Sequence, residues 1–118
     1  MGTDPEDDWS TAEYLRVTKG LLAKGLNRDA YELLQVAMRR YPDEPFLLSF
    51  HGYLSALLEG KYRNGIDACS RAIGLLGKRA LHSEEGLDER QYAVLYLNLG
   101  RSYLAGGRRK EAYDTLQK

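Results

Sequence analysis

Apolar residues recur along most of this chain at steps of three and four, which is the spacing of one face of an α-helix. In the run "YLNLGRSYLAGG", for example, Tyr96, Leu99 and Tyr103 follow these steps. Leucine, alanine, arginine, glutamate and lysine are plentiful, and this composition favours helix. The pattern predicts six helices, over residues 11–24, 28–40, 45–59, 62–76, 89–105 and 109–118.

The first helix has a well-marked start. Ser10 and Glu13 have the spacing of a capping box, and Trp9 and Tyr14 have that of a hydrophobic staple. Asn27 is the expected cap of the second helix, because its side chain can accept a bond from a free backbone N–H group.

Glycine and proline mark most of the other boundaries. A glycine suits the left-handed residue that follows a helix, and a proline disfavours helix at the residue before it. Helix ends are expected at Gly25, Pro42, Gly60, Gly77 and the pair Gly106 and Gly107. Pro45 suits the first turn of the third helix, and Asp88 with Gln91 would form a capping box for the fifth. The polar stretch from Gly77 to Glu89 is expected to be a loop, with a continued helical turn at its start as an alternative.

The helices repeat in pairs. In the third pair, Tyr96, Leu99, Gly100 and Tyr103 are followed nine residues later by Ala112. Periods of this kind indicate stacked helical hairpins, in which small residues let two helices come close.

The first pair has the same spacing, and the second pair departs from it. In the first pair, Tyr14, Val17, Thr18 and Leu21 precede Ala30 by the same intervals. In the second pair, the corresponding positions are Leu48, His51, Gly52 and Ser55, but Gly65 follows Ser55 by ten residues. The third helix is therefore expected to contain one extra residue or a bend.

These positions resemble the tetratricopeptide repeat (TPR) family over residues 11–118. The resemblance implies an all-α fold, with antiparallel helix pairs stacked as a right-handed superhelix of about three repeats, the last incomplete. A plain antiparallel bundle is the alternative. The implied organisation is an acidic lead-in over residues 1–10, repeats over 11–43 and 44–77, a loop insertion over 78–88 and a partial repeat over 89–118.

Charge and composition exclude several classes of partner. The 118 residues contain 17 basic and 17 acidic side chains, so no net field favours nucleic acid or an anionic membrane. No apolar stretch approaches the roughly 20 residues that span a bilayer, and the acidic N-terminus does not have the composition of a signal peptide. Cys69 is the single cysteine, so no internal disulfide is expected. A cytoplasmic location is the expectation.

No arrangement of residues points to catalysis, to a cofactor or to a metal. His51 and His82 lie in different elements without a cysteine or carboxylate cluster at ligand spacing. His51 is expected to be packed and hydrogen-bonded, and Cys69 to be a buried, inert thiol. Glu84 and Glu85 are read as solvated. The protein is therefore not expected to be an enzyme.

The TPR resemblance implies a concave groove, lined by the first helix of each pair, that holds a partner peptide. The residues assigned to this groove are Leu15, Lys19, Leu22, Phe50, Tyr53, Leu57, Val94, Leu97 and Arg101, with Leu54 and Leu104 as further candidates. Such a groove would be apolar with a few cations. It would differ from the TPR clamps that hold a C-terminal carboxylate, because Lys19, Asn98 and Arg101 alone are a poor match to them.

The expected function is a non-catalytic protein-interaction module that docks an apolar or amphipathic segment of a protein partner. The alternative is a structural unit that self-associates or packs on the rest of a larger protein. This alternative arises because the pattern of the last helix still runs at Lys118, with no capping residues after it. Lys118 is accordingly expected to be either an imposed boundary of a longer chain or part of an interface.

Overall fold

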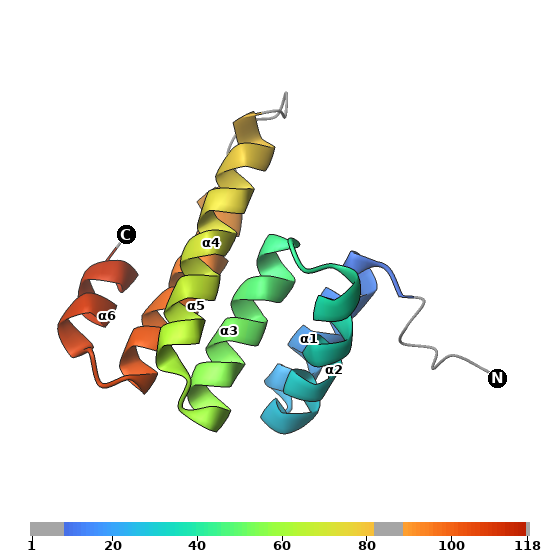
Figure 1. Cartoon of the computed structure of the whole chain (residues 1–118), viewed down its shortest axis with the longest axis horizontal. Coiled ribbons are helices and arrows are strands. Elements are labelled where there is room, and N and C mark those ends of the chain that lie inside the picture. Colours follow the sequence, from blue (N-terminus) through green and yellow to red (C-terminus); the bar gives the residue numbers. More distant parts are fainter. Residues whose placement is uncertain (1–8, 82–88, 118) are drawn as a thin grey trace.

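The computed structural model of the chain is all-α and describes residues 9–81 and 89–117, within which no strand occurs. The described residues form six helices, which Figure 1 shows as successive hairpins. Their bounds are α1 (Thr11–Ala23), α2 (Asn27–Arg40), α3 (Pro45–Glu59), α4 (Tyr62–Leu81), α5 (Glu89–Ala105) and α6 (Arg109–Leu116). The prediction of six helices is thus confirmed, but the sixth ends at Leu116, with Gln117 as its cap, before the predicted end at residue 118. Lys118 itself and the predicted cap Asp88 lie outside the described residues.

The start of α1 has the predicted cap and staple. The Ser10 hydroxyl oxygen accepts a hydrogen bond from the Glu13 backbone N–H at 3.2 Å. The Trp9 and Tyr14 rings lie 5.5 Å apart between centroids, and the Tyr41 ring lies 6.1 Å from that of Tyr14. The Tyr41 hydroxyl also donates to the Trp9 carbonyl oxygen at 3.1 Å. These contacts join the entry to α1 to the end of α2.

The turns inside the first and third hairpins have the same geometry. Gly25 and Gly107 adopt positive φ angles of 76° and 75°. The next backbone N–H closes each turn: that of Leu26 donates to the Leu21 carbonyl at 2.9 Å, and that of Arg108 donates to the Tyr103 carbonyl at 2.9 Å. This is the Schellman arrangement of a helix end.

The prediction that Asn27 caps α2 is wrong. Asn27 is already the first residue of the helix, and the cap position is occupied by Leu26, which provides no side-chain hydrogen bond. The left-handed turn at Gly25 reverses the chain within one residue. As a result α2 already begins at Asn27, and the Asn27 side chain does not occupy the cap position.

The extra residue of the second hairpin lies at the end of α3, as predicted, because Gly60 follows Ser55 by five residues, whereas Gly25 and Gly107 follow Leu21 and Tyr103 by four. Gly60 has a φ of 69°, and the backbone N–H of Lys61 donates to the Ser55 carbonyl, six residues back, at 3.3 Å. The corresponding bonds of the other two hairpins reach back five residues. The extra residue accounts for the ten-residue step from Ser55 to Gly65, and it leaves Gly52 opposite Gly65.

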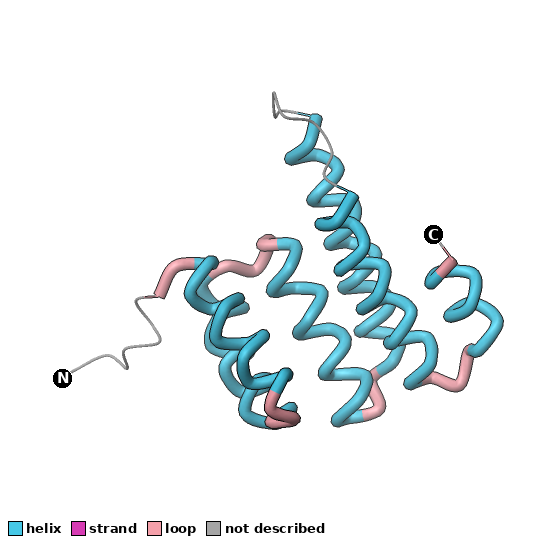
Figure 2. The backbone as a smooth tube through the Cα atoms, turned by 180° about the vertical axis from the view of Figure 1, so that it is seen from behind, coloured by secondary structure: helices cyan, strands magenta, loops and turns pink. Residues whose placement is uncertain are grey.

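The prediction that Gly77 ends the fourth helix is wrong, because α4 continues to Leu81. Residues 78–81 are helical, which confirms the alternative of a continued helical turn at the start of the predicted loop. The rest of that loop lies outside the described residues. Leu76 is 3% exposed, so the helix just before Gly77 is fixed by packing. This packing outweighs the roughly 1 kcal/mol that a glycine costs inside a helix. Figure 2 shows the end of α4 and the start of α5 projecting beyond the other helices.

Two clusters of buried side chains share α3. The first joins α3 to α1 and α2 through residues that include Tyr14, Leu34 and Leu47. The second joins α3 to α4 and α5 through Leu48, Ala72, Leu76 and Leu95. Because α3 lies between both clusters, it is apolar on nearly all sides, as its sequence "FLLSFHGYLSALL" indicates.

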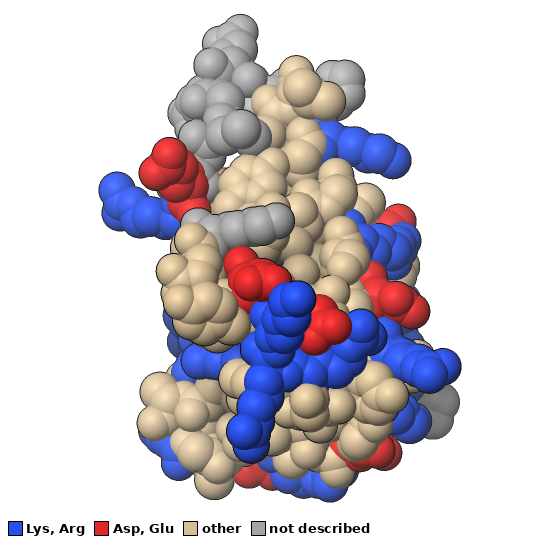
Figure 3. All heavy atoms as spheres, turned by 90° about the vertical axis from the view of Figure 1, so that its left-hand side faces the viewer, with Lys and Arg blue, Asp and Glu red and all other residues tan. Residues whose placement is uncertain are grey.

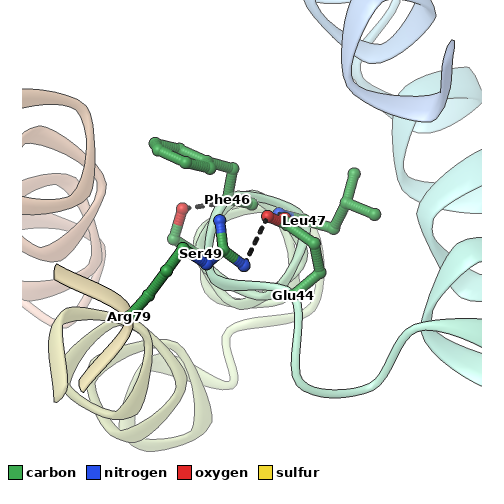
Figure 4. Close-up of polar contacts among 5 residues, drawn as sticks. All are labelled: Glu44, Phe46, Leu47, Ser49 and Arg79. Atoms are coloured by element: carbon green, nitrogen blue, oxygen red, sulfur yellow. Dashed lines mark hydrogen bonds and ion pairs between the residues drawn. The ribbon is translucent and has the colours of Figure 1, made fainter. Parts of the chain in front are cut away.

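The connection between α2 and α3 is tied to α4 by polar contacts, which Figure 4 shows in part. One oxygen of the Glu44 carboxylate accepts from the Leu47 backbone N–H at 2.8 Å and so caps α3. The other oxygen lies 3.5 Å from a guanidinium nitrogen of Arg79 in the extended part of α4. The neighbouring Asp43 forms an ion pair with Arg71. The first and second hairpins are therefore linked through this turn.

Candidate functional site

The residues assigned to the partner groove fall into three classes of exposure. Lys19, Leu57 and Leu97 are exposed, and Phe50 is buried. The half-buried ones are Leu15, Leu22, Tyr53, Val94 and Arg101. The structure brings many of these residues together, since Leu15 and Leu22 of α1, Tyr53 of α3 and Val94 of α5 all pack against the first core cluster.

The assignment of Phe50 to a binding surface is wrong. Its side chain is 6% exposed and belongs to the core cluster that α3 shares with α1 and α2. The further candidate Leu54, one helical turn later, is fully buried in the same cluster. Both residues were assigned to the groove because the apolar pattern of α3 does not distinguish its faces.

An exposed apolar surface remains where α3 and α5 lie next to each other. Its residues, called the α3–α5 face below, are Tyr53, Leu57, Leu97, Arg101 and Leu104. The exposed fraction of the side chain is 45% for Leu57, 39% for Leu97 and 50% for Leu104. Leu97, Arg101 and Leu104 follow steps of four and three, so they share one side of α5.

Arg101 is held over the ring of Tyr53. Its guanidinium carbon lies 5.2 Å from the ring centroid, within the range of a cation–π contact. No described carboxylate forms an ion pair with Arg101, although its side chain is half-buried. A guanidinium group offers five N–H donors, so this cation is oriented by its own protein and can bind an incoming acceptor.

Asn98, which matched one polar position of the carboxylate-holding TPR clamp, does not line this surface. Its side chain is fully buried, and Nδ2 donates to the Ser49 hydroxyl oxygen at 3.1 Å. The Ser102 hydroxyl in turn donates to the Asn98 carbonyl at 2.9 Å. The sequence did contain a signal of this burial, because Leu95, Asn98 and Ser102 follow the steps of three and four that mark a buried helix face.

Cys69 belongs to the same buried polar cluster. Its Sγ atom lies 3.5 Å from the Ser49 carbonyl oxygen and 3.8 Å from the Ser102 hydroxyl oxygen. Burial raises the pKa of the Cys69 thiol from an ordinary value of 9.0 to about 12. The prediction of a buried thiol is confirmed, and the thiolate that nucleophilic chemistry requires does not form near neutral pH.

This raised pKa predicts a specific loss of stability in alkali. Above about pH 9 the thiol ionises in the unfolded chain but not in the folded one, so unfolding is favoured as the pH rises towards about 12. The free energy of unfolding should fall more steeply than in a Cys69→Ala variant, by up to about 1.4 kcal/mol per pH unit. Urea denaturation of both proteins at about pH 8 and about pH 10.5 measures this difference. Parallel decreases would mean that the thiol ionises without unfolding.

His51 is packed and hydrogen-bonded, as predicted. Its ring stacks on that of Tyr31 with 5.2 Å between centroids, and Nε2 lies 3.0 Å from the Gln35 side-chain oxygen. Burial lowers the pKa of His51. The Tyr31 hydroxyl donates to the Glu59 carboxylate, and this hydrogen bond lowers the pKa of Glu59. These contacts join α2 to α3.

The described residues contain no group of three or more His, Cys, Asp or Glu side chains that could hold a metal ion. His82 and the predicted solvated residues Glu84 and Glu85 lie outside the described part of the chain. Within residues 9–81 and 89–117, each helix is too short or too polar to cross a bilayer. Comparison with protein-family models, curated protein sequences and solved structures found no match.

Proposed function

We propose that this protein is a non-catalytic interaction module, a TPR-like array that docks an apolar or amphipathic segment of a partner protein. The observation that carries the proposal is the α3–α5 face, where exposed leucines surround an oriented arginine. Contiguous apolar patches on a protein surface often mark binding sites for other proteins. A cytoplasmic setting suits the proposal but does not bear on its mechanism.

The TPR-like superhelix is part of this proposal. It is supported by the repeated turn at Gly25 and Gly107, by the close approach at Gly52 and Gly65, and by the order in which the hairpins pack. In such an array the first helices of successive pairs lie on one side, which would place Lys19 of α1 beside the α3–α5 face.

The docking mechanism combines two contributions. Covering the exposed parts of Leu57, Leu97 and Leu104 would contribute about 3 kcal/mol, at roughly half the value of a fully buried leucine for each. Arg101 would select a partner segment with a carboxylate beside its apolar side, because an oriented guanidinium binds carboxylate through two parallel hydrogen bonds. The contact with Tyr53 already restricts the conformations of the Arg101 side chain, so binding a partner costs less conformational entropy.

The test is binding to an array of amphipathic helical peptides, with and without acidic residues beside the apolar stripe. The variants Tyr53→Ala, Leu97→Ala and Arg101→Glu should each lower the affinity of peptides that bind the unaltered protein by about tenfold or more. Arg101→Glu should also remove the preference for acidic peptides.

Leu81→Ala is the matched control for this experiment. Leu81 is 84% exposed but lies at the end of α4, away from the α3–α5 face. Its replacement should leave peptide binding unchanged. If all three variants bind as well as the unaltered chain, or if Leu81→Ala weakens binding as much as they do, the α3–α5 face is not the docking surface.

A further inference from the structure

A basic residue occupies the same position in each of the three hairpins. Arg28 of α2, Arg63 of α4 and Lys110 of α6 are each the second residue of their helix. Each also stands two residues before the small residue of its repeat. A residue that recurs at one position of every unit forms a row along a stacked array.

The turns that carry these cations lie along one edge of the molecule. Figures 1 and 2 both show the α1–α2, α3–α4 and α5–α6 turns at its lower edge. The first two turns adjoin, because the hydrogen bond from Tyr31 lowers the pKa of Glu59 and the charge of Arg28 lowers it further. The last two turns are in contact, since a Cβ atom added to Gly106 would lie 2.5 Å from the ring of Tyr62.

Cations predominate along this edge. Residues 24–29, 59–64 and 106–111 contain seven basic side chains and three acidic ones. Two of the acids are already engaged, Glu59 by the Tyr31 hydroxyl and Glu111 by Arg108. The seven exposed cations, called the basic edge below, are Lys24, Arg28, Lys61, Arg63, Arg108, Arg109 and Lys110.

The basic edge gives this end of the molecule a positive field, although the whole chain has no net charge. Of its seven cations, Arg108 alone forms an ion pair within the described residues. Figure 3 views the molecule from the α6 side and shows most of the Lys and Arg side chains of that side in its lower half, where the turns lie.

The positions of the repeated cations do not favour folding. The first turn of a helix carries a partial positive charge, so acidic residues stabilise it and basic ones do not. All three repeated cations lie in first turns. In contrast, Arg71 and Arg79 of α4 each form an ion pair with a carboxylate of the turn between α2 and α3. Residues placed against local preference point to a role other than stability.

The side chains of this edge suit carboxylates better than nucleic acid. Single-stranded nucleic acid is bound by aromatic rings on which its bases stack. The aromatic residues next to these turns are half-buried: Tyr62 packs against Gly106, and the guanidinium carbon of Arg108 lies 5.7 Å from the ring centroid of Tyr103. Four of the seven cations are arginines, which can bind a carboxylate through two parallel hydrogen bonds.

We propose that the basic edge binds an acidic protein segment, rich in glutamate or aspartate, that runs along the three turns. Each turn contributes cations to the contact, so successive carboxylates of the segment meet successive hairpins. The site is separate from the α3–α5 face and does not depend on a partner bound there.

The probe for this site is a fluorescently labelled oligoglutamate peptide, and its binding to the full chain is followed by anisotropy at about 0.15 M salt. Arg63→Glu combined with Lys110→Glu should lower the affinity by about tenfold or more, because two cations of the row are reversed. The neutral pair Arg63→Gln with Lys110→Gln should lower it by about threefold. Since acidic residues suit a first turn, the urea midpoint of the Glu pair should be no lower than that of the unaltered chain.

Arg16→Glu combined with Arg39→Glu is the matched control. It makes the same change in net charge at exposed residues away from the turns, Arg16 within α1 and Arg39 at the opposite end of α2. Because charges act over only roughly 8 Å at this salt concentration, affinity for oligoglutamate should stay within about twofold.

A second comparison separates this site from the proposed function. Leu97→Ala should leave oligoglutamate binding unchanged, although it weakens the binding of amphipathic peptides to the α3–α5 face. The Glu pair at Arg63 and Lys110 should still bind those amphipathic peptides. Either surface can therefore fail its test while the other passes.

Four results would overturn the proposal for the basic edge. One is that oligoglutamate does not bind the unaltered chain, and another is that it binds the Glu pair equally well. A loss in the Arg16 and Arg39 control as large as that in the Glu pair would show attraction without a site. Single-stranded DNA of equal charge binding about tenfold more tightly than the peptide would assign the edge to nucleic acid.

Discussion

Replacing Gly65 with alanine is expected to lower the free energy of unfolding by about 3 kcal/mol. A Cβ atom at this position would lie 2.6 Å from the Gly52 carbonyl oxygen, 2.9 Å from the Ser102 hydroxyl oxygen and 3.0 Å from the Ala56 Cβ atom. The nearest of these is backbone, so α3 and α4 would have to move apart. This expected loss of about 3 kcal/mol is the net value, after the roughly 1 kcal/mol that the higher helix propensity of alanine contributes.

Gly74→Ala is the matched control, because Gly74 lies in the same helix with nothing within 4 Å of its would-be Cβ atom. This change should raise the free energy of unfolding by about 0.5–1 kcal/mol through helix propensity alone. Urea denaturation of the two variants measures the contrast. Should Gly65→Ala prove as stable as the unaltered chain, the close approach of α3 and α4 would be wrong.

Replacing Asn98 with aspartate is expected to cost about 3–5 kcal/mol at pH 7, comparable with leaving a buried charge unpaired. Asn98 is fully buried, and the change removes the Nδ2 donor to Ser49. Of the described side chains, none bonds to Asn98 Oδ1, so nothing in place compensates a negative charge there.

The loss should depend on pH in a defined direction. Burial raises the pKa of the introduced carboxyl group above its unfolded value of about 3.9, so the folded state is destabilised as the pH rises from about 4. The variant should approach the stability of the unaltered chain below about pH 4. Urea denaturation at about pH 7 and below about pH 4 measures the free energy of unfolding of the variant and of the unaltered chain.

Leu97→Asp is the control for Asn98→Asp, since Leu97 is the preceding residue and is 39% exposed. It should cost about 1 kcal/mol and show little of the pH dependence. Equal losses for the two changes would contradict the burial of Asn98.

Much of the architecture could be predicted because it depends on local chemistry. The Ser10 cap, the start at Pro45 and the left-handed turn at Gly25 each follow from the conformations available to one or two residues. The extra residue at the end of α3 was predicted with a bend as its alternative, because the spacing alone does not decide how a helix accommodates an insertion.

The candidate site was predicted less completely. Leu57, Leu97 and Arg101 do lie on an exposed surface, as predicted. The small residues of the repeat mark the packed side of each helix, and helical spacing places these three residues on another side. Phe50 was misplaced because α3 contacts neighbours on both sides. The burial of Asn98 was not predicted, because it depends on a hydrogen bond to Ser49, which is distant in the chain.

The sequence by itself determined the number of helices, most of their ends and the pairing of small residues, because glycine, proline and capping side chains act on the backbone next to them. The tertiary structure alone decided that α4 continues past Gly77, that Asn98 is buried and that Arg101 lies over Tyr53. Each of these depends on residues distant in the chain, whose packing energy outweighs local preference and becomes available only when the helices meet.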